Sequence, residues 1–305
     1  MDYCVSIMNL GDLRAFLAVV DCGGFGRAAT SLNLAQPAIS QQVRRLEKNL
    51  GTELLVRTTR SVRLSRAGEL LVPRARSIIS EVERAEDDMR LAASGRAGRV
   101  IVGFVGTATY DLLPQVTRSV NDELPKIDLE VYGEQLSPAL MEDLLAGRID
   151  IAVLRDPTPA LGITVYPLRS ELLICALPAD DPHANADRVK LSLLSDRTFV
   201  THPSGHRSAM YDTVMQACRS AGFIPSRVVQ VRETATLVAY VAAGIGVALV
   251  PDPVRTLALE TVAYRPISDV VQHTELALAT RSAPPHSPVS EVARVIISVA
   301  RGRKT

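Results

Sequence analysis

Residues 36–50 combine an apolar stripe with a face of hydrogen-bonding side chains. Pro37 fits the first turn of a helix, where its missing N–H costs no hydrogen bond, and Gly51 fits the helix end. Apolar residues recur at intervals of four, three and four from Ile39 to Leu50, as one side of a helix requires. An arginine fork can pair with O6 and N7 of guanine, and a glutamine amide with N6 and N7 of adenine. The other side of the helix therefore suits the major groove of duplex DNA; it carries Gln36, Ser40, Gln41, Arg44 and Arg45.

The segments on either side of this helix complete a DNA-reading module. Upstream, the small residues Ala28 and Ala29 with Leu32 predict a short helix that can pack closely against residues 36–50, which gives a helix-turn-helix. Downstream, residues 54–56 and 62–64, which are apolar except for Arg63, flank a polar stretch and predict a β-hairpin, the wing of a winged helix. The hairpin offers arginines to the phosphates beside the groove: Arg57, Arg60 and Arg63.

This segment resembles the amino-terminal signature of the LysR-type transcriptional regulators. Two departures are small: Gly24 stands where a serine often precedes the Phe, and Leu55-Val56 replaces the usual aromatic before the arginine. The resemblance implies a transcription regulator, not an enzyme, that binds double-stranded promoter or operator DNA, with RNA polymerase as a further candidate partner. It adds Arg27 and Pro37 to the DNA-binding residues. The matching positions are Phe25, Arg27, Ala28, Ala29, Leu32, residues 35–40, Leu46, Glu47, Leu50, Gly51, Leu54 and Arg57.

Charge is unevenly distributed along the 305 residues. Residues 1–66 hold nine Lys and Arg against five Asp and Glu, whereas the remainder holds 25 against 28. A basic head on a slightly acidic body fits a nucleic-acid module joined to a second binding function. The length predicts two or three units, and 47% hydrophobic with 22% charged residues is typical of a globular chain.

Neither export nor a membrane span is expected. The amino terminus lacks a basic region before its apolar residues, so it does not resemble a signal peptide. The most apolar stretch, 235–250, is short and is interrupted by Gly244 and Gly246. The scattered cysteines lack a C-x-x-C motif and are interpreted as reduced thiols of a cytoplasmic protein, with redox sensing as the alternative: Cys4, Cys22, Cys175 and Cys218.

A heptad pattern runs through the predicted helix after Ser65, which can cap its start. Apolar residues recur at alternating intervals of four and three from Leu71 to Ala92. Such a stripe can join two chains or pack against its own chain. The strict heptad period directly after the DNA-reading module favours a dimer. Pro73 is expected to kink or unwind the first turns. The predicted dimer residues are Leu71, Ile78, Val82, Ala85 and Met89.

Beyond a small-residue hinge at 94–98, strands and helices alternate. Two linked βαβ units with double crossovers resemble periplasmic binding proteins, the expected effector domain of the family, and the family resemblance also implies tetramers paired through these rear domains. The predicted fold class is multidomain α/β, with a winged helix-turn-helix at 1–66, a long linker helix at 67–93 and a two-lobed domain at 99–305. Lobe I is placed at about 99–168 and 270–305, and lobe II at about 169–269.

The same resemblance places a small organic effector between the lobes, near the loops after the first and second strands. Loops 106–108 and 135–137 each precede a predicted helix, whose free N–H groups and dipole suit a carboxylate. Plain helix capping by Thr107 and Ser137 is the simpler alternative, and the two roles are compatible. The predicted effector residues are Thr107, Ala108, Gln135, Ser137, Arg155, Thr201, His202, Pro203, Glu233 and Thr234.

Other chemistries find little support in the sequence. His202 and His206 are four apart, but Pro203 and Gly205 lie between them, so neither one helix nor a metal site is expected. Glycine pairs at 103–106 and 244–246 lack the spacing or context of phosphate-binding loops, and no cofactor is expected. No catalytic triad or carboxylate pair is recognisable. The alternative function is an enzyme or solute-binding module that the basic head tethers to DNA.

Overall fold

The computed structural model describes residues 8–57, 62–93, 98–157, 159–204 and 208–302. The chain divides into two compact units, and each has hydrophobic cores of its own. The first unit comprises Met1–Met89 with Leu145–Arg148, and the second comprises Arg90–Leu144 with Ile149–Thr305. Among the described residues, no helix is long and apolar enough to cross a membrane.

Short helices form the centre of the first unit: α1 (Leu10–Cys22), α2 (Phe25–Ser31) and α3 (Gln36–Leu50). The apolar stripe of α3 is buried as predicted, since Ile39, Val43 and Leu46 are fully buried against α1 and α2. Gly51 ends α3 with φ of +67°, a left-handed conformation that glycine adopts without strain. The predicted helix-turn-helix is therefore present.

The predicted hairpin follows α3 as β1 (Leu55–Arg57) and β2 (Val62–Leu64), which pair antiparallel. Its turn, with Arg60, lies outside the described residues. Ser65 caps the next helix, because its Oγ accepts a hydrogen bond from the Gly68 N–H at 3.1 Å. Gly68 lets that helix approach the hairpin closely, since a Cβ there would lie 2.2 Å from the carbonyl oxygen of Leu54.

The helix α4 (Arg66–Ala93) contains the heptad stripe and continues through Pro73 without unwinding. The structure divides the stripe into two parts. Leu71 is partly buried and Ala75 fully buried in the core of the first unit, because α4 starts directly against the hairpin. From Ile78 to Met89 the stripe is exposed or half-buried. Leu71, predicted as a dimer residue, therefore belongs to the core of its own chain.

The second unit is built around a mixed sheet. Its strands are β3 (Gly98–Val105), β4 (Ile127–Gln135), β5 (Ile151–Arg155), β6 (Ile163–Pro178), β9 (Ala248–Pro251), β10 (Val262–Pro266) and β11 (His273–Arg281). The strand order is β10-β6-β11-β5-β3-β4, with β9 also paired to β6. β3 is parallel to β4 and β5, whereas β11 is antiparallel to β5 and β6. β6 is one continuous strand of 16 residues, where the sequence pattern predicts more than one.

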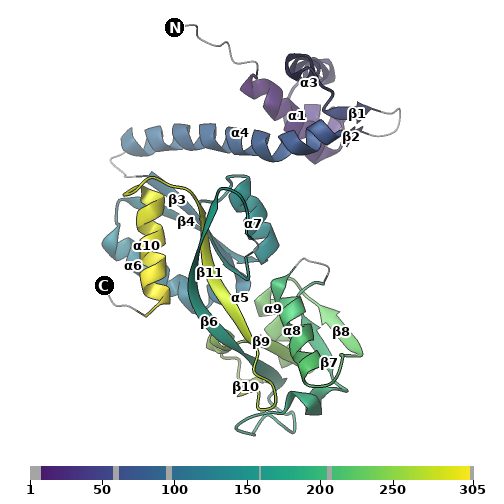
Figure 1. Ribbon diagram of the computed structural model, residues 1–305, viewed down its shortest axis with the longest axis vertical. Coiled ribbons are helices and arrows are strands. Elements are labelled where there is room, and N and C mark those ends of the chain that lie inside the picture. Colours follow the sequence, from purple (N-terminus) through teal and green to yellow (C-terminus); the bar gives the residue numbers. More distant parts are fainter. Residues whose placement is uncertain (1–7, 58–61, 94–97, 158, 205–207, 303–305) are drawn as a thin grey trace. The chain divides into compact units, whose positions relative to one another are not determined.

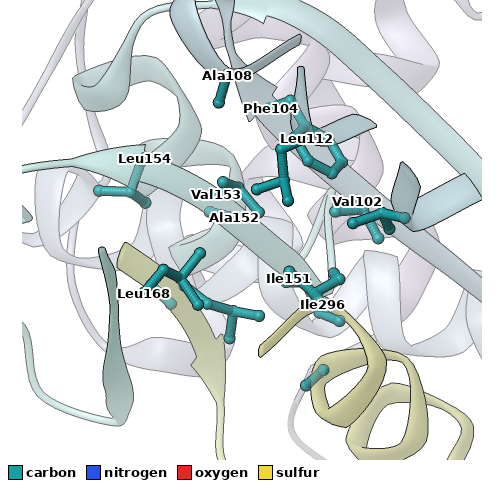
Figure 2. Close-up of a cluster of buried hydrophobic side chains, with 14 of the residues drawn as sticks. Val102, Phe104, Ala108, Leu112, Ile151, Ala152, Val153, Leu154, Leu168 and Ile296 are labelled. Atoms are coloured by element: carbon teal, nitrogen blue, oxygen red, sulfur yellow. The ribbon is translucent and has the colours of Figure 1, made fainter. Parts of the chain in front are cut away.

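One half of this unit, here called the first lobe, joins β3, β4 and β5 to flanking helices. The helices are α5 (Gly106–Thr109), α6 (Leu112–Glu123), α7 (Ser137–Leu145) and α10 (Pro288–Ala300). Figure 2 shows the core of this lobe, where Phe104 and Leu112 lie near the β5 residues Ile151 to Leu154 and Ile296 comes from α10. Parallel strands buried between helices produce the apolar runs that the sequence displays.

The other half, the second lobe, repeats the alternation. It contains β7 (Thr198–Thr201) and β8 (Arg227–Gln230), which are parallel, with α8 (Ala209–Ser220) and α9 (Thr234–Ala242). β6 and β11 run from the first lobe toward the second (Figure 1). Most strands and helices expected from the sequence are thus present. The exceptions are β6, which is a single strand, and the helix expected from Thr107 to Val120, which is divided into α5 and α6. The long antiparallel pair β6–β11 connects the lobes.

Candidate functional site

The polar face of α3 is open on the first unit. Gln36, Pro37, Gln41 and Arg44 are exposed, and Ser40 is half-buried. Within the described part of the chain, Arg44 takes part in no hydrogen bond or ion pair, so its guanidinium is available to a base edge or a phosphate. The α3 helix therefore presents donors and acceptors of the kinds that the major groove recognises.

Arg45 has a structural partner that Arg44 lacks. Its Nε donates to Oδ2 of Asp12 at 2.8 Å, and its Nη2 pairs with the other carboxylate oxygen. The Asp12 side chain is 1% exposed, whereas that of Arg45 is 51% exposed. A buried carboxylate is costly without a partner, so Arg45 ties α3 to α1. The sequence prediction counted Arg45 among the DNA readers and missed Asp12, because no local pattern marks that residue as buried.

Other residues of the signature position the module. Arg27, a predicted DNA-binding residue, is exposed on α2, and its Nη2 donates to the carbonyl oxygen of Gly23 at 3.1 Å. Glu47 Oε1 accepts hydrogen bonds from the N–H groups of Leu54 and Leu55, at 3.0 and 3.2 Å, and so joins α3 to the start of the hairpin. Of the hairpin arginines, the structure describes the side chain of Arg63, which is exposed on β2.

A small pocket lies between the two lobes of the second unit. Its volume is about 10 Å³, room for about one water molecule. The predicted effector residues that line it are Thr107, Gln135, Ser137, His202 and Thr234. The sequence prediction missed the other lining residues, which carry no motif: Val105, Gly106, Leu136, Ser208, Met210 and Arg232.

The remaining predicted effector residues do not line this pocket. Ala108 belongs to the core of the first lobe. Thr201 and Pro203 are buried beside His202. Glu233 is exposed and accepts a hydrogen bond from the Thr236 hydroxyl at 3.1 Å. The sequence prediction places these positions near the site through their loops, but their side chains do not line the pocket.

Arg155 lies fully buried behind the pocket and organises its first-lobe side. Its Nε donates to Thr107 Oγ1 at 2.6 Å, and its backbone N–H donates to Ser137 Oγ at 2.9 Å. The expected helix-start role of Thr107 needs correction, because α5 has only four residues and the hydroxyl oxygen accepts from Arg155. Each hydroxyl still carries its own proton and can donate to an anion.

Ion pairs extend from Arg155 to β6, the strand that connects the lobes. Arg155 Nη2 pairs with Glu171 Oε2 at 2.5 Å, and Arg169 Nε pairs with Glu171 Oε1 at 2.6 Å. Arg169 also pairs with Asp111 through Nη2. Glu171 is 3% exposed in its side chain, so the buried charges of Arg155 and Glu171 compensate each other.

Several buried polar atoms without a partner belong to residues of the pocket lining or to residues next to them. Among the described residues, these atoms include Arg155 Nη1, Thr201 Oγ1, His202 Nδ1, Thr234 Oγ1 and Glu134 Oε1. Native interiors leave few such atoms, and a group of them in one place is typical of a ligand site. No sequence pattern marks Glu134, because the partner of its side chain, Thr234, lies 100 residues farther along the chain.

His202 and the cysteines have shifted acid–base properties. Burial lowers the pKa of His202, and the nearby Arg155 charge lowers it further, so the imidazole is neutral near pH 7. Burial raises the pKa of the Cys175 and Cys218 thiols to about 12. In the part of the chain that the structure describes, no three His, Cys, Asp or Glu residues are grouped to hold a metal ion.

Family models match both units. Residues 10–69 match the model of bacterial regulatory helix-turn-helix proteins of the lysR family, and residues 93–300 match the LysR substrate binding domain. The HTH-type transcriptional regulator AlsR of Bacillus subtilis (strain 168) is 32% identical over 274 residues, which cover 90% of each chain.

Two solved structures give the comparison in three dimensions. Full-length CbnR in complex with its target DNA superposes with a TM-score of 0.71 and 26% identity, covering 97% of this chain and 100% of that chain. The effector binding domain of BenM with its effector benzoate gives a TM-score of 0.58 and 27% identity, covering 68% of this chain and 95% of that domain. The likeness therefore extends over both units.

Proposed function

This chain belongs to the LysR family of bacterial transcription regulators, and from that premise we propose how it reads DNA and senses an effector. It is a DNA-binding regulator with an effector-binding domain, and its curated relatives are regulators rather than enzymes. In our proposal, α3 enters the major groove. Gln36, Gln41 and Arg44 face base edges there, whereas Ser40 and the hairpin arginines 57, 60 and 63 face phosphates. The open, unpaired Arg44 and the DNA complex of CbnR support this assignment.

The proposal includes a homodimer joined through the exposed part of α4. Ile78 and Met89 are 36% and 68% exposed, and Val82 and Ala85 lie between them on the same stripe. A two-fold dimer would read two half-sites related by the same symmetry. We also propose that two dimers pair through their second units to form a tetramer. The tetramer contacts RNA polymerase and is cytoplasmic.

We further propose that a small organic carboxylate binds between the lobes. The observation that carries this is the group of buried polar atoms without partners around the pocket. Thr107 and Ser137 offer hydroxyl protons, and neutral His202 offers a ring nitrogen. The benzoate held by BenM is a carboxylate, which supports the ligand class. Because the pocket has room for about one water molecule, ligand entry requires the lobes to move apart locally.

Thr234→Val is the sharpest test of the effector site. The Thr234 hydroxyl is fully buried and has no partner within the described residues, so its removal costs the ligand-free protein little. A panel of carboxylates larger than acetate, beginning with benzoate, is titrated into the full chain while its melting temperature is followed. We expect at least one to bind the wild type and to bind Thr234→Val about tenfold more weakly.

Thr213→Val is the matched control, since the Thr213 hydroxyl donates to Ala209 on α8 and does not line the pocket. This variant should bind like the wild type. Equal affinity of Thr234→Val and wild type for the active carboxylate would contradict the site, and a panel without any binder would contradict the ligand class.

A further inference from the structure

The carboxylate of Glu134 lies at the N-terminus of α9. Its Oε2 accepts a hydrogen bond from the Thr234 N–H at 2.9 Å, and the neighbouring Ala235 N–H also favours the charged carboxylate. Glu134 comes from β4 in the first lobe, whereas α9 belongs to the second lobe. The hydrogen bond from Thr234 therefore joins the lobes directly beside the pocket that Thr234 lines.

The contact has the chemistry of anion binding. Free N–H groups at the start of a helix, together with the helix dipole, favour a negative charge. In this chain the negative charge is a side chain of the protein itself. Burial raises the pKa of the Glu134 carboxyl, and the two backbone N–H groups offset part of that rise. The other carboxylate oxygen, Oε1, is buried and has no partner among the described residues, so only part of the hydrogen-bonding capacity of Glu134 is used.

Gly106 makes room for the contact. A Cβ at this position would lie 2.4 Å from Glu134 Oε2 and 2.8 Å from Thr234 Oγ1, so any side chain would displace one of them. Gly106 also lines the pocket. The Glu134 carboxylate therefore lies next to two residues that line the proposed effector site, Gly106 and Thr234.

A second observation points to a ligand at this place. Thr234 is fully buried, and its hydroxyl oxygen has no partner although it lies next to the bound carboxylate. A carboxylate seated slightly differently could use the hydroxyl as well as the N–H groups. The N-terminus of α9 can therefore form more hydrogen bonds with a carboxylate than it forms with Glu134.

We propose that the N-terminus of α9 is a carboxylate site which Glu134 occupies in the ligand-free protein, and that the carboxylate of the effector takes its place. The replacement of Glu134 by the effector carboxylate rests on the proposed effector function, whereas the existence of the carboxylate site at α9 does not. While Glu134 is bound, the lobes are held together around a small pocket. An arriving carboxylate releases that link, so it favours one arrangement of the lobes over the other, as an effector must.

Acetate rescue of Glu134→Ala tests the site in the full chain. The substitution removes the atoms beyond Cβ, and acetate matches the two carbons and two oxygens that are lost. We expect amide hydrogen exchange in the peptide around 233–238 to become about tenfold faster in Glu134→Ala. Sodium acetate should return most of this protection, while sodium chloride at the same ionic strength should not.

Glu134→Gln is the matched control. It fills the same space and keeps one acceptor oxygen but loses the charge, so acetate should leave its exchange unchanged. Should Glu134→Ala fail to fold, Glu134→Asp replaces it, because a shorter side chain withdraws the carboxylate and should also speed exchange at 233–238. The carboxylate site would be overturned if amide exchange in Glu134→Ala or Glu134→Asp equalled that of the wild type. It would also be overturned if acetate did not slow exchange in Glu134→Ala. Because acetate rescue involves neither effector nor DNA, its failure is distinct from failure of the proposed function.

Discussion

Arg155 and Thr107 are joined by a hydrogen bond of 2.6 Å from the guanidinium Nε to the hydroxyl oxygen, and both residues are buried. The arginine fixes the threonine oxygen as an acceptor, so the hydroxyl proton is left to point elsewhere. One buried arginine thus sets the orientation of a group that lines the pocket, without lining the pocket itself.

Thr107→Val should destabilise the protein, whereas Thr234→Val should not. The first substitution leaves Arg155 Nε buried without an acceptor, at a cost of about 1–3 kcal/mol, while the second removes a hydroxyl that has no partner in the described structure. The melting temperatures of the two full-length variants are compared. A melting temperature of Thr107→Val equal to the wild type would show that another group replaces the lost acceptor.

Arg44→Ala and Arg45→Ala, adjacent substitutions on α3, should affect different properties: the first DNA binding, the second stability. Arg45→Ala leaves the buried Asp12 carboxylate without its partner and should lower the melting temperature. Arg44→Ala should leave stability unchanged and weaken specific DNA binding by about 1–3 kcal/mol if the arginine reads a base. Thermal melting and fluorescence anisotropy separate the two outcomes; a stable Arg45→Ala would refute the structural role.

Val82→Glu should dissociate the dimer. The substitution places a carboxylate in the exposed part of the α4 stripe, where a partner helix would desolvate it next to its symmetry mate. Arg74→Glu is the control, because Arg74 is exposed on α4 outside the stripe. Sedimentation should show smaller species for Val82→Glu only. An unchanged mass at micromolar concentration would show that the stripe has another partner.

The predicted parts of the fold depend on local pattern. Ile39, Val43 and Leu46 share a stripe that the α3 spacing reveals, and the cap at Ser65 is visible as a residue type before a helix. The heptad stripe of α4 is equally regular, yet its start at Leu71 packs on its own core. Periodicity identifies an apolar face but not its partner.

The unpredicted parts of the site depend on contacts between distant residues. Arg155 meets Glu171 on another strand, and Glu134 meets Thr234 in the other lobe. Asp12 and Arg45 are likewise on different helices. No spacing within a segment records such a pair, so the sequence located the loops of the pocket and Arg155 but not the partners of these charges.

Cys175 and Cys218 should resist modification in the folded protein. Burial raises the pKa of both thiols to about 12, so both stay protonated and poorly nucleophilic at pH 7 to 8. Iodoacetamide followed by mass spectrometry should label them only after denaturation. Rapid labelling of either thiol in the native state, or a disulfide between them after brief exposure to hydrogen peroxide, would favour redox sensing.

Sequence-specific DNA reading by α3 is the central claim, and selection from a random duplex library tests it most directly. The full chain should select a sequence with two-fold-related half-sites. In anisotropy titrations at physiological salt, it should bind that sequence about 10³-fold or more tightly than a scrambled duplex. Arg44→Ala should lose much of this preference while keeping its salt-dependent affinity for any duplex. Equal affinity of the wild type for the selected and scrambled duplexes would contradict the account.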